Sequence, residues 1–471
     1  MKNTKTNKLN IALWLSLVLV LNLGCERELS DDATVATFAQ TGEIFTDNFV
    51  AMGSNFYFPF ADSKLDAFSV DTREGFESNA SYRVDVPNDT DPTGNYAGAI
   101  LRVDGAGRDL SGFNVLTFYA KASRGVSVDA IGFGQDFFEN KHQVTANNVS
   151  VGTNWQKYYI PIPDPSLLVN ERGVFWYAAG TQATGGSGYV LWFDEIKFEK
   201  LGTIGQPRPG IANGDDITID SFIGVTAAVT GLIHTVSLPT GIDGTVAPAI
   251  SYFQFSSSNP SVATVDNTGI ISVLAAGTAK ITATLGGVQA NGSVTINSLG
   301  DFVLAPTPSR DPSNVISIFS DHYNNRPVDF FNGFWQPFQT TESADFVVNG
   351  DNILNYTNFN FVGNRFGNPP VNATNFSNLH LNMYIPGQVP ANLDFLISIV
   401  NFGPDGVEGG GDDTRQQVFF NASDFVANTW ATLEIPITLP QRSNIGLIIY
   451  ENVNASTLRN FYLDNIYFYI E

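Results

Sequence analysis

The chain has 471 residues and a formal charge of −22, from 24 Lys and Arg against 46 Asp and Glu. This length suits about three domains, each large enough for a hydrophobic core of its own. An acidic chain without a basic block repels phosphate backbones, so nucleic acid is not expected as a partner. One Cys and four His exclude a disulfide framework, a zinc finger and an iron–sulfur site.

The N-terminus has the pattern of an export signal. Residues 1–9 hold Lys but no acid, and residues 11–23 form an apolar run that is too short to span a membrane. Cys25 follows Gly24, where the signal peptide of a bacterial lipoprotein is cut and the Cys acylated. We therefore expect a signal peptide over 1–24 and a lipid-anchored Cys25, with no transmembrane helix in the mature chain. The alternative is an ordinary signal peptide with an incidental Cys.

The polar residues 25–39 after this Cys are expected to form a flexible tether. Beyond them, a long-range repeat organises the chain. Four short stretches recur in the same order in both halves: 44–49 with 318–323, 113–118 with 376–381, 155–162 with 430–437, and 192–198 with 462–468. The repeat predicts a duplicated domain over residues 40–200 and 313–471. Trp155 and Trp430 occupy the same place in the two copies, and we expect both in the core.

Both copies are expected to be all-β. Their residues alternate between apolar and polar in short runs separated by Gly, Asn, Asp and Pro, and neither copy has an amphipathic helical run of 12 residues. A unit of about 160 residues with this pattern is typical of a jelly-roll β-sandwich.

The region between the copies divides into three parts. Residues 201–215 and 298–312 are rich in Gly and Pro and are expected to be linkers. Residues 216–297 hold short alternating runs, and their stretch 255–283 closely resembles the bacterial Ig-like domain of group 2. That resemblance implies a small Ig-like β-sandwich, which usually serves as a spacer.

No catalytic motif is present. No Glu is followed two positions later by Asp, as jelly-roll glycosidases with Glu-x-Asp-x-x-Glu require, and no Gly-x-Ser-x-Gly, His-Glu-x-x-His or Walker loop occurs. The protein is therefore not expected to be an enzyme. A glycoside hydrolase on a jelly-roll fold remains the alternative, because two carboxylates brought together by folding could act on a sugar.

Aromatic residues are the candidates for sugar binding, because the C–H faces of sugars stack on aromatic rings. Trp176 has an aliphatic counterpart in the second copy, Trp192 faces away from its apolar neighbours and is replaced there by Tyr462, and Phe334 and Trp335 lie in a Gly- and Pro-broken aromatic loop. For these residues, packing in the core or at its rim is the alternative to ligand stacking.

Four acids recur at equal positions in the two copies: Asp47 and Asp194 in the first, Asp321 and Asp464 in the second. The opening and closing strands of a jelly roll can lie side by side, where two carboxylates would repel each other unless a cation intervened. We expect one structural Ca²⁺ in each copy, since calcium takes carboxylate and carbonyl oxygens. The alternative is that these Asp side chains cap turns.

The whole plan resembles the surface glycan-binding lipoproteins of polysaccharide-utilisation systems in Bacteroidota, and the closing strands 193–196 and 463–466 are similar to those of calcium-containing carbohydrate-binding modules. The resemblance implies a non-catalytic protein, lipid-anchored on the cell surface at the outer membrane. It would capture polysaccharide, with a laminarin-like β-glucan as the candidate, near a TonB-dependent importer and a partner glycan-binding lipoprotein. A surface adhesin or structural protein is a further alternative.

Overall fold

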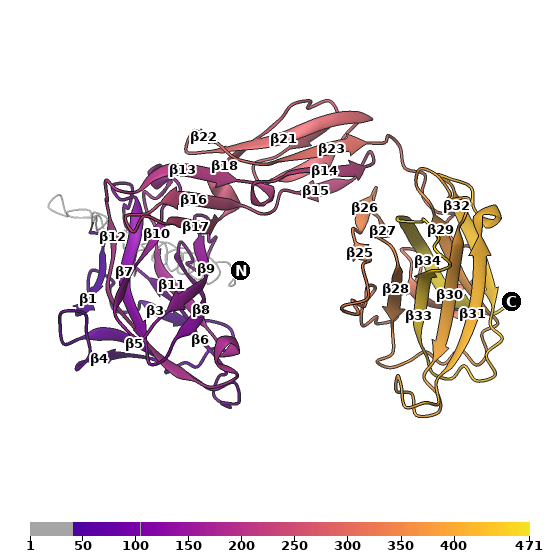
Figure 1. Cartoon of the computed structure of the whole chain (residues 1–471), viewed down its shortest axis with the longest axis horizontal. Helices are drawn as coiled ribbons and strands as arrows, with labels where there is room; N and C mark the ends of the chain where they lie inside the picture. Colours follow the sequence, from indigo (N-terminus) through magenta and orange to yellow (C-terminus); the bar gives the residue numbers. More distant parts are fainter. Residues whose placement is uncertain (1–40, 104) are drawn as a thin grey trace, which may run out of the picture.

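The computed structural model describes residues 41–103 and 105–471, so the expected signal peptide 1–24, the lipidated Cys25 and the tether 25–39 lie outside the described residues. Regular structure in the described part is almost entirely β, with six 3₁₀ turns of three residues each, which confirms the expected all-β class. No helix among the described residues is long and apolar enough to cross a membrane. Figure 1 shows two sandwiches at the ends of an arch, with a smaller β unit between them.

The first module is a two-sheet sandwich. Its strands are β1 (Glu43–Thr46), β2 (Asn48–Phe49), β3 (Tyr57–Pro59), β4 (Phe68–Asp71), β5 (Ser81–Val86), β6 (Ala97–Arg102), β7 (Val115–Ala122), β8 (Val126–Phe133), β9 (Val144–Val151), β10 (Gln156–Pro161), β11 (Gly173–Ala179) and β12 (Tyr189–Glu199), with turns η1 (Pro165–Leu167) and η2 (Gln182–Thr184). One sheet runs β10-β7-β12-β1-β2, with β5 on β12 and β4 on β5, and the other includes β9-β8-β11-β6-β3. Apolar side chains from both sheets fill the space between them.

The middle unit contains β13 (Gly205–Gly210), β14 (Asp216–Ser221), β15 (Thr226–Ala228), β16 (Ile233–Ser237), β17 (Asp243–Pro248), β18 (Phe253–Ser257), β19 (Ala263–Val265), β20 (Ile270–Val273), β21 (Gly277–Leu285), β22 (Val288–Gln289) and β23 (Ser293–Ser298), with η3 (Ala212–Gly214) and η4 (Ile250–Tyr252). Its two sheets are β14-β23-β21-β18, with β22 on β21, and β15-β20-β19.

The first expected linker is structured. Within 201–215, β13 pairs with β16, and the β16–β17 hairpin joins β9, so that these strands extend the first module's sheet to the order β13-β16-β17-β9-β8-β11-β6-β3. Pro207 and Pro209 fit in β13 because it is an edge strand, where a missing N–H breaks no ladder. The same prolines made this segment resemble a linker in the sequence.

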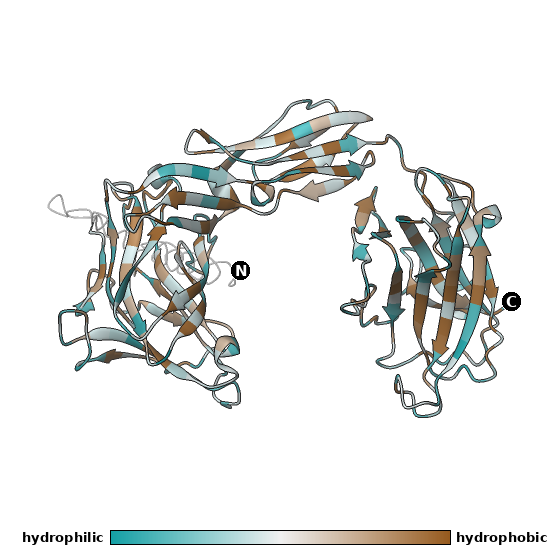
Figure 2. Cartoon of the chain, viewed as in Figure 1, coloured by the Kyte–Doolittle hydropathy of each residue, from teal (hydrophilic) through white to brown (hydrophobic). Residues whose placement is uncertain are grey.

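The second module repeats the two-sheet plan. Its strands are β24 (Val315–Phe319), β25 (Glu342–Ser343), β26 (Phe346–Val348), β27 (Asp351–Thr357), β28 (Phe361–Arg365), β29 (Asn378–Tyr384), β30 (Asp394–Asn401), β31 (Thr414–Asn421), β32 (Trp430–Pro436), β33 (Ile445–Asn452) and β34 (Phe461–Tyr469), with η5 (Pro312–Asn314) and η6 (Ala422–Asp424). The sheets are β25-β27-β34-β29-β32, with β24 on β34 and β26 on β27, and β28-β33-β30-β31. Figure 2 shows hydrophobic residues concentrated on the strands of both sandwiches.

The second expected linker, 298–312, has no regular structure between Ser298, which ends β23, and Pro312, which begins η5, but it is packed against the second module. Phe302 contacts Trp430 edge-to-face at a ring distance of 6.0 Å, and the Trp430 indole N–H donates to the carbonyl of Val303 at 2.7 Å. Phe222 of the Ig-like unit lies 4.7 Å from Phe302 in the same apolar cluster. The segment is therefore a strap that joins the middle unit to the β25-β27-β34-β29-β32 sheet.

A buried arginine holds the start of the first module. Arg108 is fully buried, and its guanidinium donates to the backbone carbonyls of Thr41, Glu43 and Val50. Hydrogen bonds from a charged donor in a dry environment are stronger than neutral ones, and their loss leaves buried acceptors unpaired. The position of β1 on the sandwich therefore depends on this side chain.

We expect Arg108→Met to destabilise the first module by about 1–3 kcal/mol, because it leaves buried backbone carbonyls without a hydrogen-bond donor. Differential scanning calorimetry of the full chain should show one transition at a lower temperature and the others unchanged. The exposed Arg124 provides the control, and Arg124→Met should leave all transitions in place. Equal melting profiles for both variants would contradict this role of Arg108.

Candidate functional site

The outer face of the β9-β8-β11-β6-β3 sheet carries a row of apolar residues that do not belong to the core. Four neighbouring strands each place one residue in this row: Phe58 of β3, Ile100 of β6, Trp176 of β11 and Gly132 of β8. Each residue is the cross-strand partner of the next, so all four share one face. Tyr177, the next residue along β11, packs in the core between the sheets. Trp176 therefore faces away from the core.

Two glycines let aromatic rings lie against this face. A Cβ at Gly132 would come within 2.7 Å of the Trp176 indole nitrogen, and a Cβ at Gly98 would lie 2.7 Å from the ring of Phe60 and 3.0 Å from that of Tyr96. Side chains larger than Gly would push these rings off the sheet. The rings consequently form an aromatic floor, although Trp176 is only 6% exposed and offers little of its own surface.

The exposed aromatic surface comes from a loop that the sequence analysis did not single out. Phe137 and Phe138 are 46% and 63% exposed. The Phe137 ring lies 6.4 Å from that of Phe60, and the Arg102 guanidinium lies 4.0 Å from the ring of Phe58 and 5.0 Å from that of Phe138. These contacts connect the loop to the aromatic floor.

A polar cavity of about 350 Å³ opens at the other end of the same face, beside Ala178, which lies two positions beyond Trp176. Its lining includes Asp89, Asn95, Tyr96, Asp129 and Gln182. The Asp129 carboxylate accepts the N–H of Gly180 at 2.8 Å. No hydrogen bond joins the side chains of Asp89, Asn95 or Gln182 to another described residue, so their bonding capacity is open to a ligand.

We call this surface, made of the aromatic floor, the Phe137–Phe138 loop and the polar cavity, the first-module groove. Trp176 is the one predicted sugar-binding residue that belongs to it. Phe58, Ile100 and Asp129 lie on strands. The remaining polar and aromatic members lie in turns and loops, where Asn, Gln and Phe carry no periodic signal that could have selected them.

Trp192 lies on the opposite sheet of the first module. Its indole N–H donates to Asp71 at 3.1 Å, and the Lys121 amine and the Arg83 guanidinium lie 5.0 and 5.7 Å from its ring. Trp155 lies beside the same Lys121 at 5.5 Å and is half-buried on this outer surface, not in the core as expected. These aromatic residues are thus engaged with charged neighbours of their own sheet.

Tyr462, the counterpart of Trp192, is not open to a ligand. It is 4% exposed, stacks on Tyr384 at 5.3 Å and meets Phe222 of the Ig-like unit edge-to-face. The alternation correctly indicates that it faces away from the core of its sandwich. The middle unit and the strap pack over Tyr462 and cover it. They also half-bury Trp430, which therefore does not occupy the core position expected for it.

Trp335 and Phe334 lie on different surfaces of the second module. The Trp335 ring stacks at 6.0 Å on Phe361 and lies over Gly363, where a Cβ would come within 2.3 Å of it. It thus covers the outer face of β28-β33-β30-β31, a sheet with the same strand order as β6-β11-β8-β9. Phe334 instead is 56% exposed and lines a cavity.

In the first module the predicted acids do not form an open site. Asp194 is 1% exposed, and its two oxygens accept the backbone N–H groups of Glu195 and Phe76, both at 2.7 Å. Burial raises the pKa of Asp194, and the nearby charges of Glu195 and Asp47 act in the same direction. Both Asp194 oxygens are therefore already occupied by donors, as the turn-capping alternative expects.

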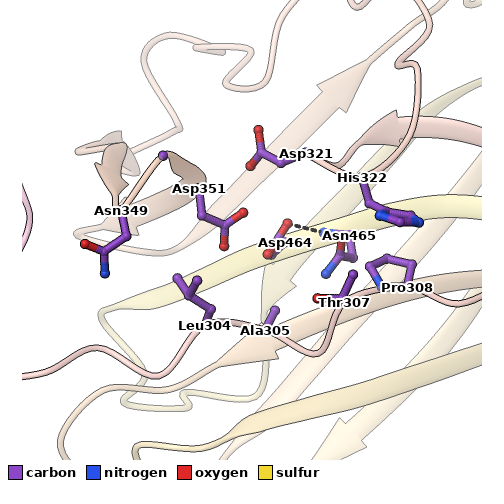
Figure 3. A pocket seen from close by; sticks show the side chains of 11 residues that line it. Leu304, Ala305, Thr307, Pro308, Asp321, His322, Asn349, Asp351, Asp464 and Asn465 are labelled. Atoms are coloured by element: carbon purple, nitrogen blue, oxygen red, sulfur yellow. Dashed lines mark hydrogen bonds between the residues drawn. The ribbon is translucent and has the colours of Figure 1, made fainter.

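In the second module three acids surround a cavity of about 290 Å³: Asp321 and Asp464, both predicted, and Asp351. Figure 3 shows them on one side of this cavity, with Leu304 and Ala305 of the strap on the other. Burial, together with the charges of Asp351 and Asp321, raises the pKa of Asp464 to about 7, and burial next to Asp321 raises that of Asp351 to about 7.

The residue types around this cavity suit calcium, but their positions do not form a finished ligand set. Carboxylate and amide oxygens are the donors that calcium prefers. Across 41–103 and 105–471, no group of three or more His, Cys, Asp or Glu is arranged to hold a metal ion. Bound calcium would require these carboxylates to draw closer together.

Family comparisons match two parts of the chain. Residues 41–198 match the model of carbohydrate binding domain 30, and residues 223–298 match that of the bacterial Ig-like domain (group 2). No curated protein matches the chain at a significant level.

Among solved structures, the chain is 22% identical to a family 30 carbohydrate-binding module, over 35% of this chain and 100% of that one, with a TM-score of 0.27. It is 20% identical to the family 30 module of the cellulosomal cellulase Cel9D-Cel44B of Clostridium thermocellum, over 35% and 99%, with a TM-score of 0.26. A family 11 module of the same organism, in complex with a β-1,3-1,4-mixed-linked tetrasaccharide, is 17% identical over 28% and 85%, with a TM-score of 0.21. By these matches, the first module is similar to carbohydrate binding domain 30, and the unit that follows it is similar to the bacterial Ig-like domain (group 2).

Proposed function

We propose that this protein binds polysaccharide without cleaving it, and that the glycan lies in the first-module groove. The observation that carries the proposal is the combination of exposed rings with three polar side chains, Asp89, Asn95 and Gln182, that make no hydrogen bond to other described residues. Aromatic faces remove the C–H faces of a sugar from water, and carboxylates and amides bind its hydroxyls. The match of residues 41–198 to a carbohydrate-binding domain supports the same function.

The ligand class follows from charge. A chain with a formal charge of −22 repels polyanionic glycans, and the polar cavity itself contains two carboxylates. We therefore propose a neutral polysaccharide, with a laminarin-like β-glucan as the first candidate.

The cellular setting is proposed from the sequence. The basic and apolar N-terminus before Cys25 supports a lipid-anchored protein on the outer membrane of a bacterium of the Bacteroidota type. There the protein would hold glycan for a TonB-dependent importer, together with a partner glycan-binding lipoprotein.

The competing functions differ in what they release or bind. A glycoside hydrolase would release reducing ends from the polysaccharide, and an adhesin would bind cells or protein but no glycan. Both matched domain types are non-catalytic, which favours binding.

We expect Phe137→Ala and Gln182→Ala each to weaken the binding of laminarin about tenfold, because each removes one stacking ring or one hydroxyl partner, worth about 1.4 kcal/mol. Isothermal titration calorimetry on the full chain measures the change in Kd. Trp192→Ala is the matched control on the opposite sheet and should leave Kd unchanged. A loss of affinity in Trp192→Ala alone would move the site to that sheet, and no binding to any neutral polysaccharide would refute the proposed function.

We also propose that the second module binds one calcium ion between Asp321, Asp351 and Asp464. The three carboxylates around one cavity support this, and burial together with their mutual repulsion raises the pKa values of Asp351 and Asp464. Donors already bind acids in both modules: Asp194 accepts two backbone N–H groups, and Asp321 accepts two hydrogen bonds from Asn352. The second module differs in bringing a third carboxylate, Asp351, to the same cavity.

We expect the second module to lose stability in chelator as the pH rises from about 4 to about 7. An acid whose folded pKa lies above its unfolded value of about 3.9 is protonated in the folded state over that interval, so deprotonation destabilises the fold. Calcium should reverse the loss at pH 8, and Asp464→Asn should raise the melting temperature in chelator and abolish the calcium response. Asp194→Asn serves as the control that keeps this response. If calcium leaves the melting profile of the wild-type chain unchanged, the proposed calcium site in the second module is refuted.

A further inference from the structure

We infer that the second module carries a saccharide site of its own, at one end of its sandwich and separate from the first-module groove. The site is a cavity of about 720 Å³ between the loops 334–342, 358–360 and 452–459. Its lining includes Phe334, Glu342, Asn360, Asn452 and Arg459. The inference rests on the proposed function and adds a second binding site to it, in a part of the chain that lies beyond both matched domains.

The cavity wall is fixed by hydrogen bonds before any ligand arrives. Gln339 is 3% exposed, donates to Asn332 at 2.6 Å and accepts the N–H of Trp335. Asn360 accepts the N–H of Thr340 at 2.9 Å and donates to the carbonyl of Phe338 at 2.8 Å. A wall that is already ordered loses little conformational entropy when it binds a ligand.

The aromatic loop divides its rings between two surfaces. Trp335 packs over Gly363 on the sheet, whereas its neighbour Phe334 lines the cavity and keeps more than half of its surface exposed. An exposed ring at the rim of a cavity of this size can stack on one sugar unit while the cavity holds the next.

The polar groups of the lining retain unused bonding capacity. The Arg459 guanidinium donates to the carbonyl of Leu458 at 3.0 Å and has no ion pair among the described residues. The Glu342 carboxylate accepts from Asn358 at 3.1 Å through one of its two oxygens. Donors and acceptors thus face the same space, as the hydroxyl groups of a sugar require.

The charges select the class of ligand. One arginine and one glutamate line the cavity, so its formal charges cancel, and the acidic chain around it disfavours anionic glycans. The volume fits a short segment or an end of a chain. The structure therefore assigns a neutral oligosaccharide to this cavity.

The experiment is calorimetric titration of the full chain with laminarin oligosaccharides and with mixed-linkage β-glucan, xylan and mannan oligosaccharides. We expect the Phe137→Ala/Gln182→Ala double variant to keep one binding event at the second module. Adding Phe334→Ala or Arg459→Ala should weaken that event at least tenfold. Phe338→Ala is the matched control, because Phe338 lies in the same loop, is 75% exposed and does not line the cavity.

The outcomes separate the two claims. If the wild-type chain binds and the double variant loses all binding, the second site is refuted and the first-module groove stands. Binding in the double variant that is unchanged by Phe334→Ala and Arg459→Ala, or weakened equally by Phe338→Ala, also refutes the second site. If the wild-type chain binds none of these glycans, the proposed function fails and the second site fails with it.

Discussion

The absence of a Cβ atom at a few strand positions is the constraint on which the apolar outer faces of the two modules depend. Aromatic rings reach the outer faces of the sheets where glycine leaves room, at Gly98 for Phe60 and Tyr96, and at Gly363 for Trp335. On an ordinary strand residue, the side chain itself would occupy this space and hold the ring away from the backbone. The backbone and the packed rings together form an apolar outer surface on each module, and polar loops can lie next to it.

The outer face of the opposite sheet in each module is occupied by other contacts. In the first module Trp192 is tied to Asp71 and flanked by Lys121. In the second, Phe302 of the strap and Phe222 of the Ig-like unit cover Tyr462. Continuous pairing of β17 with β9 joins the middle unit to the first module as well. The Ig-like unit is thus packed against both sandwiches, which suits a spacer that fixes the positions of the two modules relative to each other.

Much of the fold could be predicted from the sequence, because strand alternation and repeated motifs are local signals. The all-β class and the Ig-like resemblance were of this kind. Strand β13 was missed because its prolines are typical of linkers, and only its place at a sheet edge makes them acceptable. The packing of 298–312 depends on tertiary contacts of Phe302, which no local sequence pattern predicts.

The site was less predictable than the fold. Alternation indicated that the position shared by Trp192 and Tyr462 faces away from the core, but it could not show that Tyr462 would be buried under another domain. The aliphatic counterpart of Trp176 could not show that this ring would be nearly covered. Phe137, Asn95 and Gln182 lie in loops, where their role depends on which loops meet in space. Phe334 was selected from the sequence because an aromatic cluster in a Gly- and Pro-broken loop is a poor solvated surface.

Hydrogen–deuterium exchange of the full chain with and without soluble laminarin tests the central claim most directly, because it locates the ligand without any substitution. The account predicts slower exchange in the loops 87–96, 134–143 and 180–188 around the first-module groove, with no change in the Trp192 face at 71–80. Protection confined to 71–80, or saturating laminarin without protection of any of the three groove loops, would contradict it.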